Sequence, residues 1–173
     1  MATELKEDLE KWPEDLTLSS NSKNFSRKNV LLAIKPIHAY NILFGNKKWE
    51  YRRVNMHAED NARIFLYASA KVHAIVGEAV IEKIVYETVD QIIEHTLNEV
   101  TETADDLRRA FIGHKRGCAI RLNNPIRYEK PIALTFLRQK IPKFTPPQGF
   151  YYIKEGNTLL DILAVQKSYK VWQ

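Results

Sequence analysis

Features that mark several common protein classes are scarce in this sequence. Its 173 residues include one cysteine, Cys118, and only six glycines. A single cysteine cannot form an internal disulfide, which excludes a disulfide scaffold and favours a reducing compartment. The low glycine content excludes a collagen-like chain. No apolar run approaches the roughly 18–20 residues that a membrane-spanning helix needs, so the sequence predicts no membrane segment.

Signatures of secretion and of cofactors are also missing. Residues 1–10 are acidic and lack an apolar stretch, so we expect no secretory signal and a cytoplasmic protein. Glycine-rich nucleotide loops, the Gly-x-Ser-x-Gly nucleophile elbow and zinc-ligand spacings are absent from the sequence. The five histidines are scattered along the chain. The sequence therefore predicts neither a cofactor nor a bound metal.

Positive charge is abundant but unevenly distributed. The net charge is +5. Residues 31–86 and 113–173 together hold 19 basic and 8 acidic residues, a net charge of +11, whereas residues 87–112 carry a net charge of −5. Such an excess favours a polyanionic partner, because Lys and Arg displace the counterions of phosphate groups. The acidic segments 1–16 and 87–112 are candidates for contact with a protein partner instead.

The order of apolar and polar residues predicts a mixed α+β fold. Residues 30–34 are apolar throughout, as in a strand covered on both faces, and Pro36 favours the first turn of a helix that Gly45 would end. Many short strands with two helical interruptions indicate a small β-barrel or a strongly bent sheet decorated with helices. The further predicted strands cover residues 47–53, 62–68, 72–87, 118–122, 126–128, 131–136 and 150–153.

A change of hydrophobic period marks a helical insert among these strands. Residues 88–111 suit two short helices, and Thr101 or Thr103 could cap the second one. Before the insert, Gly77 predicts a bulge or a close backbone approach. After it, residues 123–125 (Asn-Asn-Pro) predict a turn between two strands.

The strongest chemical pattern lies in residues 45–52, Gly-Asn-Lys-Lys-Trp-Glu-Tyr-Arg. Because side chains alternate along a strand, we expect Glu50 and Arg52 on one face, toward water or a cleft. The same alternation places Trp49 and Tyr51 on the opposite face, in the barrel core.

Two lysines compete for a place beside this charged pair. Lys48 has the parity to join the charged face, whereas Lys47 sits where helix, turn and strand meet and can swing onto it, so the pattern leaves both open. Arginine and lysine can bind phosphate, and glutamate can accept hydrogen bonds from the amino groups of a base. A surface ladder of ion pairs would explain the same residues without any ligand.

Four residues of this stretch match a known family pattern. Gly45, Lys47, Glu50 and Arg52 reproduce the Gly-x-Lys-x-x-Glu-x-Arg signature, and the sequence therefore resembles the ASCH domain family, a branch of the PUA-like β-barrel superfamily. The preceding apolar strand and helix agree with this resemblance, which covers roughly residues 29–153.

The resemblance implies a PUA-like barrel with a cleft beside the first helix. In this family the cleft binds RNA, single-stranded DNA or a nucleoside, and Lys47, Glu50 and Arg52 would line it. Some small relatives are amidohydrolases that deacetylate N4-acetylcytidine; Lys47 matches their lysine, but Glu50 replaces their threonine. Other relatives cut RNA. The alternatives are therefore nucleic-acid binding in transcription- or RNA-related regulation and hydrolysis of a modified nucleoside or RNA, with Lys47 and Glu50 as candidate catalytic residues.

Four more residues are candidates for ligand binding. Tyr67 and Ser69 leave a strand near the expected floor of the cleft, where a tyrosine could stack on a base. Lys115 and Arg116 lie in a loop between two glycines, which suits contact with a phosphate backbone.

The segments outside the resemblance are expected to be additions to one domain. Residues 1–28 form an acidic N-terminal appendage and linker, in which four apolar residues have the spacing of a helical stripe. Residues 154–173 form a C-terminal extension.

Overall fold

The computed structural model describes residues 29–166 and 168–170. The predicted N-terminal appendage, 1–28, lies outside the described residues. The remaining chain mixes strands and helices, which confirms the predicted α+β class. Its elements are β1 (Asn29–Ile34), α2 (Pro36–Leu43), β2 (Trp49–Arg52), β3 (Arg63–Ala68), β4 (Ala74–Thr88), α3 (Val89–Thr96), the short 3-10 helix η1 (Leu97–Glu99), α4 (Ala104–Ala110), β5 (Arg116–Ala133), α5 (Leu134–Lys140), β6 (Phe150–Ile153), α6 (Thr158–Ala164) and β7 (Ser168–Lys170).

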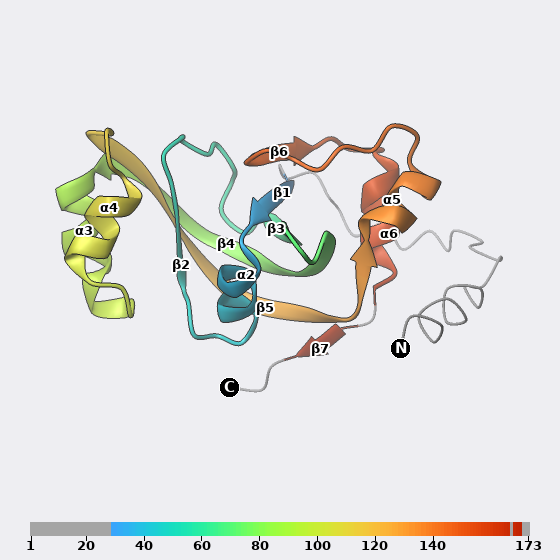
Figure 1. Cartoon of the computed structure of the whole chain (residues 1–173), viewed down its shortest axis with the longest axis horizontal. Helices are drawn as coiled ribbons and strands as arrows, with labels where there is room; N and C mark the ends of the chain where they lie inside the picture. Colours follow the sequence, from blue (N-terminus) through green and yellow to red (C-terminus); the bar gives the residue numbers. More distant parts are fainter. Residues whose placement is uncertain (1–28, 167, 171–173) are drawn as a thin grey trace.

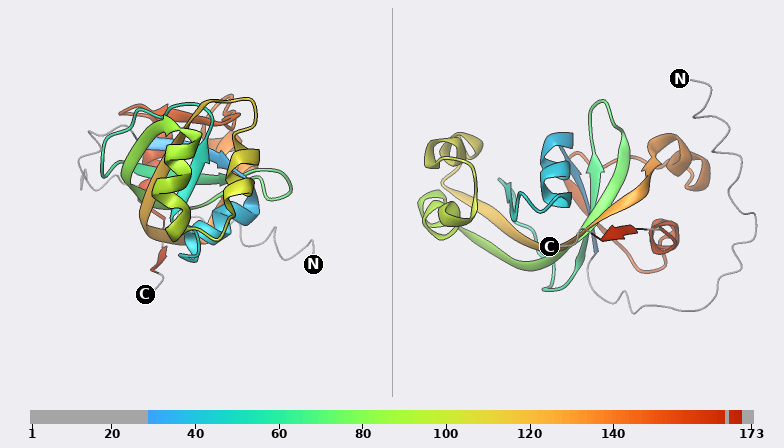
Figure 2. Two further views of the ribbon diagram at one scale, coloured as in Figure 1. Left: turned by 90° about the vertical axis from the view of Figure 1, so that its left-hand side faces the viewer. Right: turned by 90° about the horizontal axis from the view of Figure 1, so that it is seen from below.

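The strands of the described residues form one sheet. Its order is β2-β5-β4-β3-β1-β6, with β7 paired to β5 outside this order. Strands β1 and β3 run parallel, and the neighbouring pairs β3–β4, β4–β5 and β2–β5 run antiparallel. The long β4 and β5 carry the helical insert, α3 and α4, at one end of the molecule, and α5 and α6 lie at the other (Figures 1 and 2). Because β2 and β6 end the order and these described strands do not pair, closure of the sheet into a barrel stays a prediction.

Two hydrophobic clusters lie on opposite faces of the sheet. On β1, Val30 and Leu32 belong to the cluster under α2, whereas Leu31 belongs to the cluster under α5 and α6. All three side chains are fully buried. The strand is therefore covered on both faces, as its uninterrupted apolar sequence predicts. Helix α6, from the predicted C-terminal extension, packs Leu159 and Leu163 into the same second cluster.

A third, smaller cluster joins the sheet to the helical insert. Trp49 packs with Ile92 and Phe111, and Tyr51 lies against Phe111 with the ring centroids 6.0 Å apart and the rings nearly perpendicular. The prediction that Trp49 and Tyr51 share one face of the strand is confirmed. The prediction that this face lies in the barrel core is wrong. The insert covers that face of β2 and makes its own core there.

Gly77 permits a close packing contact between strands and helix. The pairing register shifts between Ile75 and Gly77, and a Cβ atom added at Gly77 would lie 2.6 Å from the Leu43 side chain and against the backbone oxygen of Ile126. The predicted bulge and close approach are both confirmed.

The region after the insert differs from its prediction. Residues 123–125 form no turn between strands; they lie within β5, where Asn124 has a φ of 46° and the pairing with β4 shifts register. The predicted strand 131–136 ends at Ala133, and helix α5 follows at once because Leu137 turns into the second cluster. Long-range pairing with β4 carries the strand through a sequence that locally favours a turn.

The two helices of the insert are confirmed with their caps. The Thr103 side chain accepts a hydrogen bond from the backbone N–H of Asp106, and the Asp106 carboxylate accepts from Thr103, so Thr103 rather than Thr101 begins α4. Among the described helices, none combines the length and apolar composition needed to cross a membrane.

Candidate functional site

A cleft of about 890 Å³ opens where the sheet meets the helical insert. Its walls come from the end of β1, the start of α2, β2, the insert and residues 147–148. This volume lies in the range of small-molecule sites.

The turn after α2 fixes Lys47 at the mouth of this cleft. Gly45 adopts a φ of 77°, and the backbone N–H of Lys47 donates to the Asn41 carbonyl at 3.0 Å. The Lys47 Nζ atom lies 2.8 Å from the Glu102 carboxylate of the insert and 5.2 Å from the centroid of the Tyr51 ring. Because the Lys47 side chain is only 8% exposed, this pairing satisfies an ammonium group that has little contact with water.

Glu50 and Arg52 share one face of β2, as strand alternation predicts. A carboxylate oxygen of Glu50 lies 2.9 Å from Arg52 Nη2, which also donates to the Ala33 carbonyl at 2.9 Å. Glu50 is 6% exposed, so this partner compensates a charge that is almost removed from water. The buried Arg52 Nε atom has no hydrogen-bond partner among the described residues.

Alternate residues from Lys47 onward hold the insert against β2. Trp49 Nε1 donates to Glu99 at 2.6 Å, the Tyr51 hydroxyl donates to Thr96 Oγ1 at 2.8 Å, and Arg53 Nε donates to the Ala110 carbonyl at 2.9 Å. These contacts are the physical reason that the insert forms a wall of the cleft. Burial, only partly offset by the Thr96 hydrogen bond, raises the pKa of Tyr51 to about 12.

The charges in the cleft nearly cancel. Burial lowers the pKa of His38, and the positive charge of Lys47 lowers it further. Burial opposes ionisation of Glu102, but the hydrogen bond and charge of Lys47 outweigh it and lower the pKa of that carboxyl. The cleft therefore has little net charge, although several of its individual side chains are charged. Its fixed cations are Lys35, Lys47, Arg52 and Arg109, and its carboxylates are Glu50, Glu102 and Asp106.

Comparisons with known proteins identify the family to which this chain belongs. A family model described as a domain of unknown function, DUF365, matches residues 40–142. A Zymomonas mobilis protein named as an ASCH domain-containing ribonuclease is 30% identical over 134 residues, which cover 76% of this chain and 88% of that protein. The chain belongs to the ASCH domain family.

Solved structures agree with this membership of the ASCH family. The crystal structure of ASCH from Zymomonas mobilis has a TM-score of 0.71 and 27% identity, and the match covers 81% of this chain and 96% of that one. A Pseudomonas syringae protein has a TM-score of 0.51 at 11% identity, covering 79% of this chain and 98% of that one, and shows the fold alone.

Four predicted site residues of this ASCH domain lie in one cleft. Lys47, Glu50, Arg52 and Ser69 all line it, and the Ser69 hydroxyl donates to the Ile34 carbonyl at 3.1 Å. The structure places Tyr67 elsewhere: its side chain is buried in the second cluster, where it offers no exposed ring to a base. Burial also raises the pKa of Tyr67.

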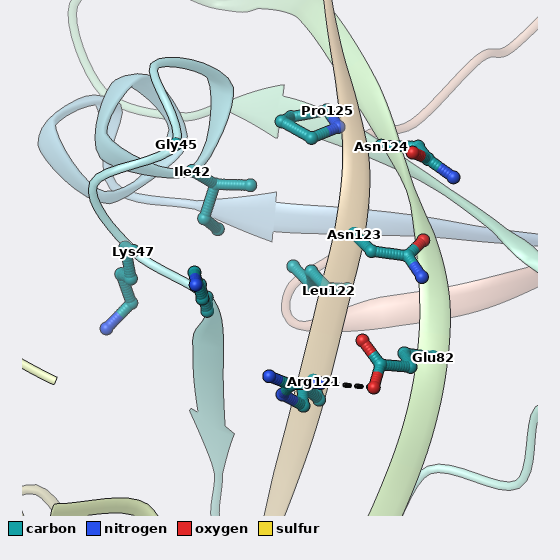
Figure 3. A pocket seen from close by; sticks show the side chains of 10 residues that line it. Ile42, Gly45, Lys47, Glu82, Arg121, Leu122, Asn123, Asn124 and Pro125 are labelled. Atoms are coloured by element: carbon teal, nitrogen blue, oxygen red, sulfur yellow. Dashed lines mark hydrogen bonds and ion pairs between the residues drawn. The ribbon is translucent and has the colours of Figure 1, made fainter. Parts of the chain in front are cut away.

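The sequence left open whether Lys47 or Lys48 joins Glu50 and Arg52, and the structure favours Lys47. Lys48 lines a smaller polar pocket of about 180 Å³, together with Glu82 and Arg121, whereas Lys47 lines both this pocket and the cleft. Figure 3 shows this pocket, with Arg121 ion-paired to Glu82 and the Lys47 side chain pointing away from them. Lys48 therefore does not share the cleft of Glu50 and Arg52.

The predicted phosphate loop also lies outside the cleft. Arg116 begins β5 at the base of the insert, where its Nη2 atom donates to the Tyr86 carbonyl at 2.6 Å and its guanidinium lies 5.0 Å from the centroid of the Tyr86 ring. Neither Lys115 nor Arg116 lines the cleft.

Sequence analysis missed the contribution of the insert and of α2. His38, Glu102 and Arg109 line the cleft, although the acidic insert was interpreted only as a surface for a protein partner. The capping box that begins at Thr103 marks the start of α4 just after Glu102, but no local signal indicates that Glu102 folds back onto Lys47. A protein partner for the insert stays a prediction.

Proposed function

We propose that this ASCH domain binds single-stranded RNA in the cleft and cleaves it there. The observation that carries the proposal is that Lys47, Glu50 and Arg52, which match the family signature, line one cleft of about 890 Å³. The relative that is named as a ribonuclease, at 30% identity, supports RNA as the substrate.

The cations would hold a backbone phosphate. Lys47 supplies a point charge and Arg52 a planar group whose geometry suits two phosphate oxygens. Glu50 lies 2.9 Å from Arg52 and would keep the guanidinium oriented toward the cleft. In this role Glu50 positions Arg52, whereas the sequence analysis gave Glu50 hydrogen bonds from the amino groups of a base.

Cleavage through the ribose 2′-hydroxyl would need a proton acceptor beside the phosphate. His38 lines the cleft, and its lowered pKa leaves the imidazole neutral near pH 7. The 2′-oxygen would give its proton to His38 and attack phosphorus; the bond to the 5′-oxygen would break, and that oxygen would take up a proton. Lys47 and Arg52 would stabilise the charge that develops on the phosphate.

An end-labelled RNA of about ten nucleotides tests this proposal, with its all-DNA counterpart alongside. We expect the RNA to be cut and the DNA to bind uncut, because DNA lacks the 2′-hydroxyl. Lys47→Ala combined with Arg52→Ala should abolish cleavage. The control Lys48→Ala removes one positive charge directly beside Lys47 but outside the cleft and should cleave normally.

Equal cleavage by the double variant and by Lys48→Ala would overturn the assignment of the cleft. Absence of binding and cleavage by the folded wild-type protein would overturn the function itself. N4-acetylcytidine is included as a second substrate, and its conversion without RNA cleavage would favour the amidohydrolase alternative over the ribonuclease.

A further inference from the structure

A second cavity adjoins the cleft and is mainly apolar. It measures about 330 Å³ and lies between the end of β2, the end of α4 and the start of β6. Tyr51, Arg52 and Ala110 line both this cavity and the cleft, so the two adjoin at those residues. We call it the aromatic pocket, because Tyr51, Phe111 and Phe150 contribute to its lining.

The walls of the aromatic pocket are held in place by packing and hydrogen bonds. Phe111 is 2% exposed and packs with its ring nearly perpendicular to that of Tyr51, so it supports the wall, and the partly exposed rings of Tyr51 and Phe150 are the ones that can face a base. Arg53 Nε donates to the Ala110 carbonyl at 2.9 Å, which ties the end of α4 to β2. On the third side, the Gly149 carbonyl accepts from the Ala33 N–H at 2.8 Å. The pocket is therefore built before any ligand enters.

We propose that the aromatic pocket binds the nucleobase next to the phosphate held by Lys47 and Arg52. This inference rests on the proposed function and narrows the substrate to an RNA segment with at least one unpaired base turned into the protein. Aromatic walls bind the flat face of a base, and arginines at the rim can stack on it. The shared residue Arg52 would lie between the phosphate in the cleft and the base in the pocket.

The geometry favours a single strand over a duplex. A paired base is stacked inside its helix and cannot enter a pocket 330 Å³ in size. The polar pocket beside Lys48 is a poorer candidate for a base, because it measures only about 180 Å³ and its Arg121 is already ion-paired to Glu82 and Glu99.

Gly149 allows the aromatic pocket to be filled without a change to the cleft. Gly149 lines the aromatic pocket but not the cleft, and a Cβ atom added to it would meet no other atom within 4 Å. Gly149→Leu should occupy the pocket, and Gly149→Ala is the matched control. Phe150→Leu is a second test, because it removes an aromatic face and keeps an apolar side chain of similar size.

The measurement compares a short RNA with the same RNA that lacks one base but keeps its ribose and phosphates. We expect the wild-type protein and Gly149→Ala to bind the intact RNA about tenfold more tightly than the abasic RNA, the effect of one stacked base. Gly149→Leu and Phe150→Leu, checked for folding by circular dichroism, should lose most of this ratio and bind the abasic RNA normally.

The outcomes separate the two proposals. One outcome is that the wild-type protein binds intact and abasic RNA equally, wherever in the RNA the base is missing, and that binding still requires Lys47 and Arg52. In that case the aromatic pocket is not a base site, but the proposed function stands. If the tenfold ratio survives in both Leu variants, the pocket assignment is also wrong. If neither RNA binds, the proposed function fails with it.

Discussion

Glu102→Gln should strengthen RNA binding, because the Glu102 carboxylate competes with a phosphate for Lys47. In the structure Glu102 lies 2.8 Å from Lys47 Nζ. A phosphate on the same ammonium would lie roughly 5 Å from that carboxylate, and at an effective dielectric constant of about 40 two such charges repel by about 1.7 kcal/mol. Removal of one charge should therefore lower the Kd by about twentyfold. Glutamine keeps an oxygen that can accept the Lys47 hydrogen bond.

Fluorescence anisotropy with a labelled RNA at low salt measures this change directly. The matched control is Glu94→Gln, the same substitution at an exposed position of α3 that does not line the cleft. It should change the Kd by less than about twofold, because Glu94 is exposed and the high dielectric constant of the surrounding water weakens its repulsion of a phosphate in the cleft. Thermal unfolding of each variant checks that the fold is retained.

An unchanged or higher Kd for Glu102→Gln would refute the reasoning. Glu102 would then orient Lys47 for the ligand instead of competing with it. An equal gain for Glu94→Gln would also refute it, because the effect would then come from net charge alone.

Three further predictions concern binding, packing and pH. If Lys47 and Arg52 are the phosphate contacts, a plot of log K against log salt concentration should have a slope of about −1.4 for single-stranded RNA, and a slope steeper than about −4 would place the interface elsewhere. Gly77→Ala should lower the free energy of unfolding by about 1–3 kcal/mol, whereas Gly149→Ala should change it little, as measured by urea denaturation; equal effects would contradict the steric argument. Because the pKa of His38 is lowered in the folded state, the unfolded chain takes up this proton first as the pH falls through 6.5, so folding stability should drop there; His38→Asn should reduce that drop, and an identical pH profile would disprove the shift.

Local patterns in the sequence predicted much of the sheet. Residues 30–34 indicate a doubly covered strand because every side chain is apolar, and Gly77 indicates a bulge because a side chain would clash there. Strand alternation correctly placed Glu50 and Arg52 on one face. In each case the deciding information lies within a few residues.

Contacts between distant residues were not predictable in the same way. Lys47 and Glu102 are 55 positions apart, and no pattern near either residue specifies their meeting. Residues 123–125 favour a turn locally, but pairing with β4 extends the strand through them. Tyr67 was wrongly predicted to lie in the cleft for the same reason. Its burial in the second cluster depends on tertiary packing, which the local sequence does not reveal.

The contacts from Trp49, Tyr51 and Arg53 to the insert give it a small core apart from the two main clusters. Neither main cluster contains a residue of 89–110, so exchange of that segment with the corresponding segment of another ASCH protein should leave both clusters in place. Such a chimera would exchange one wall of the cleft and part of the aromatic pocket together. Under the proposed function, the ligand preference of such a chimera would follow the origin of this one contiguous stretch of sequence.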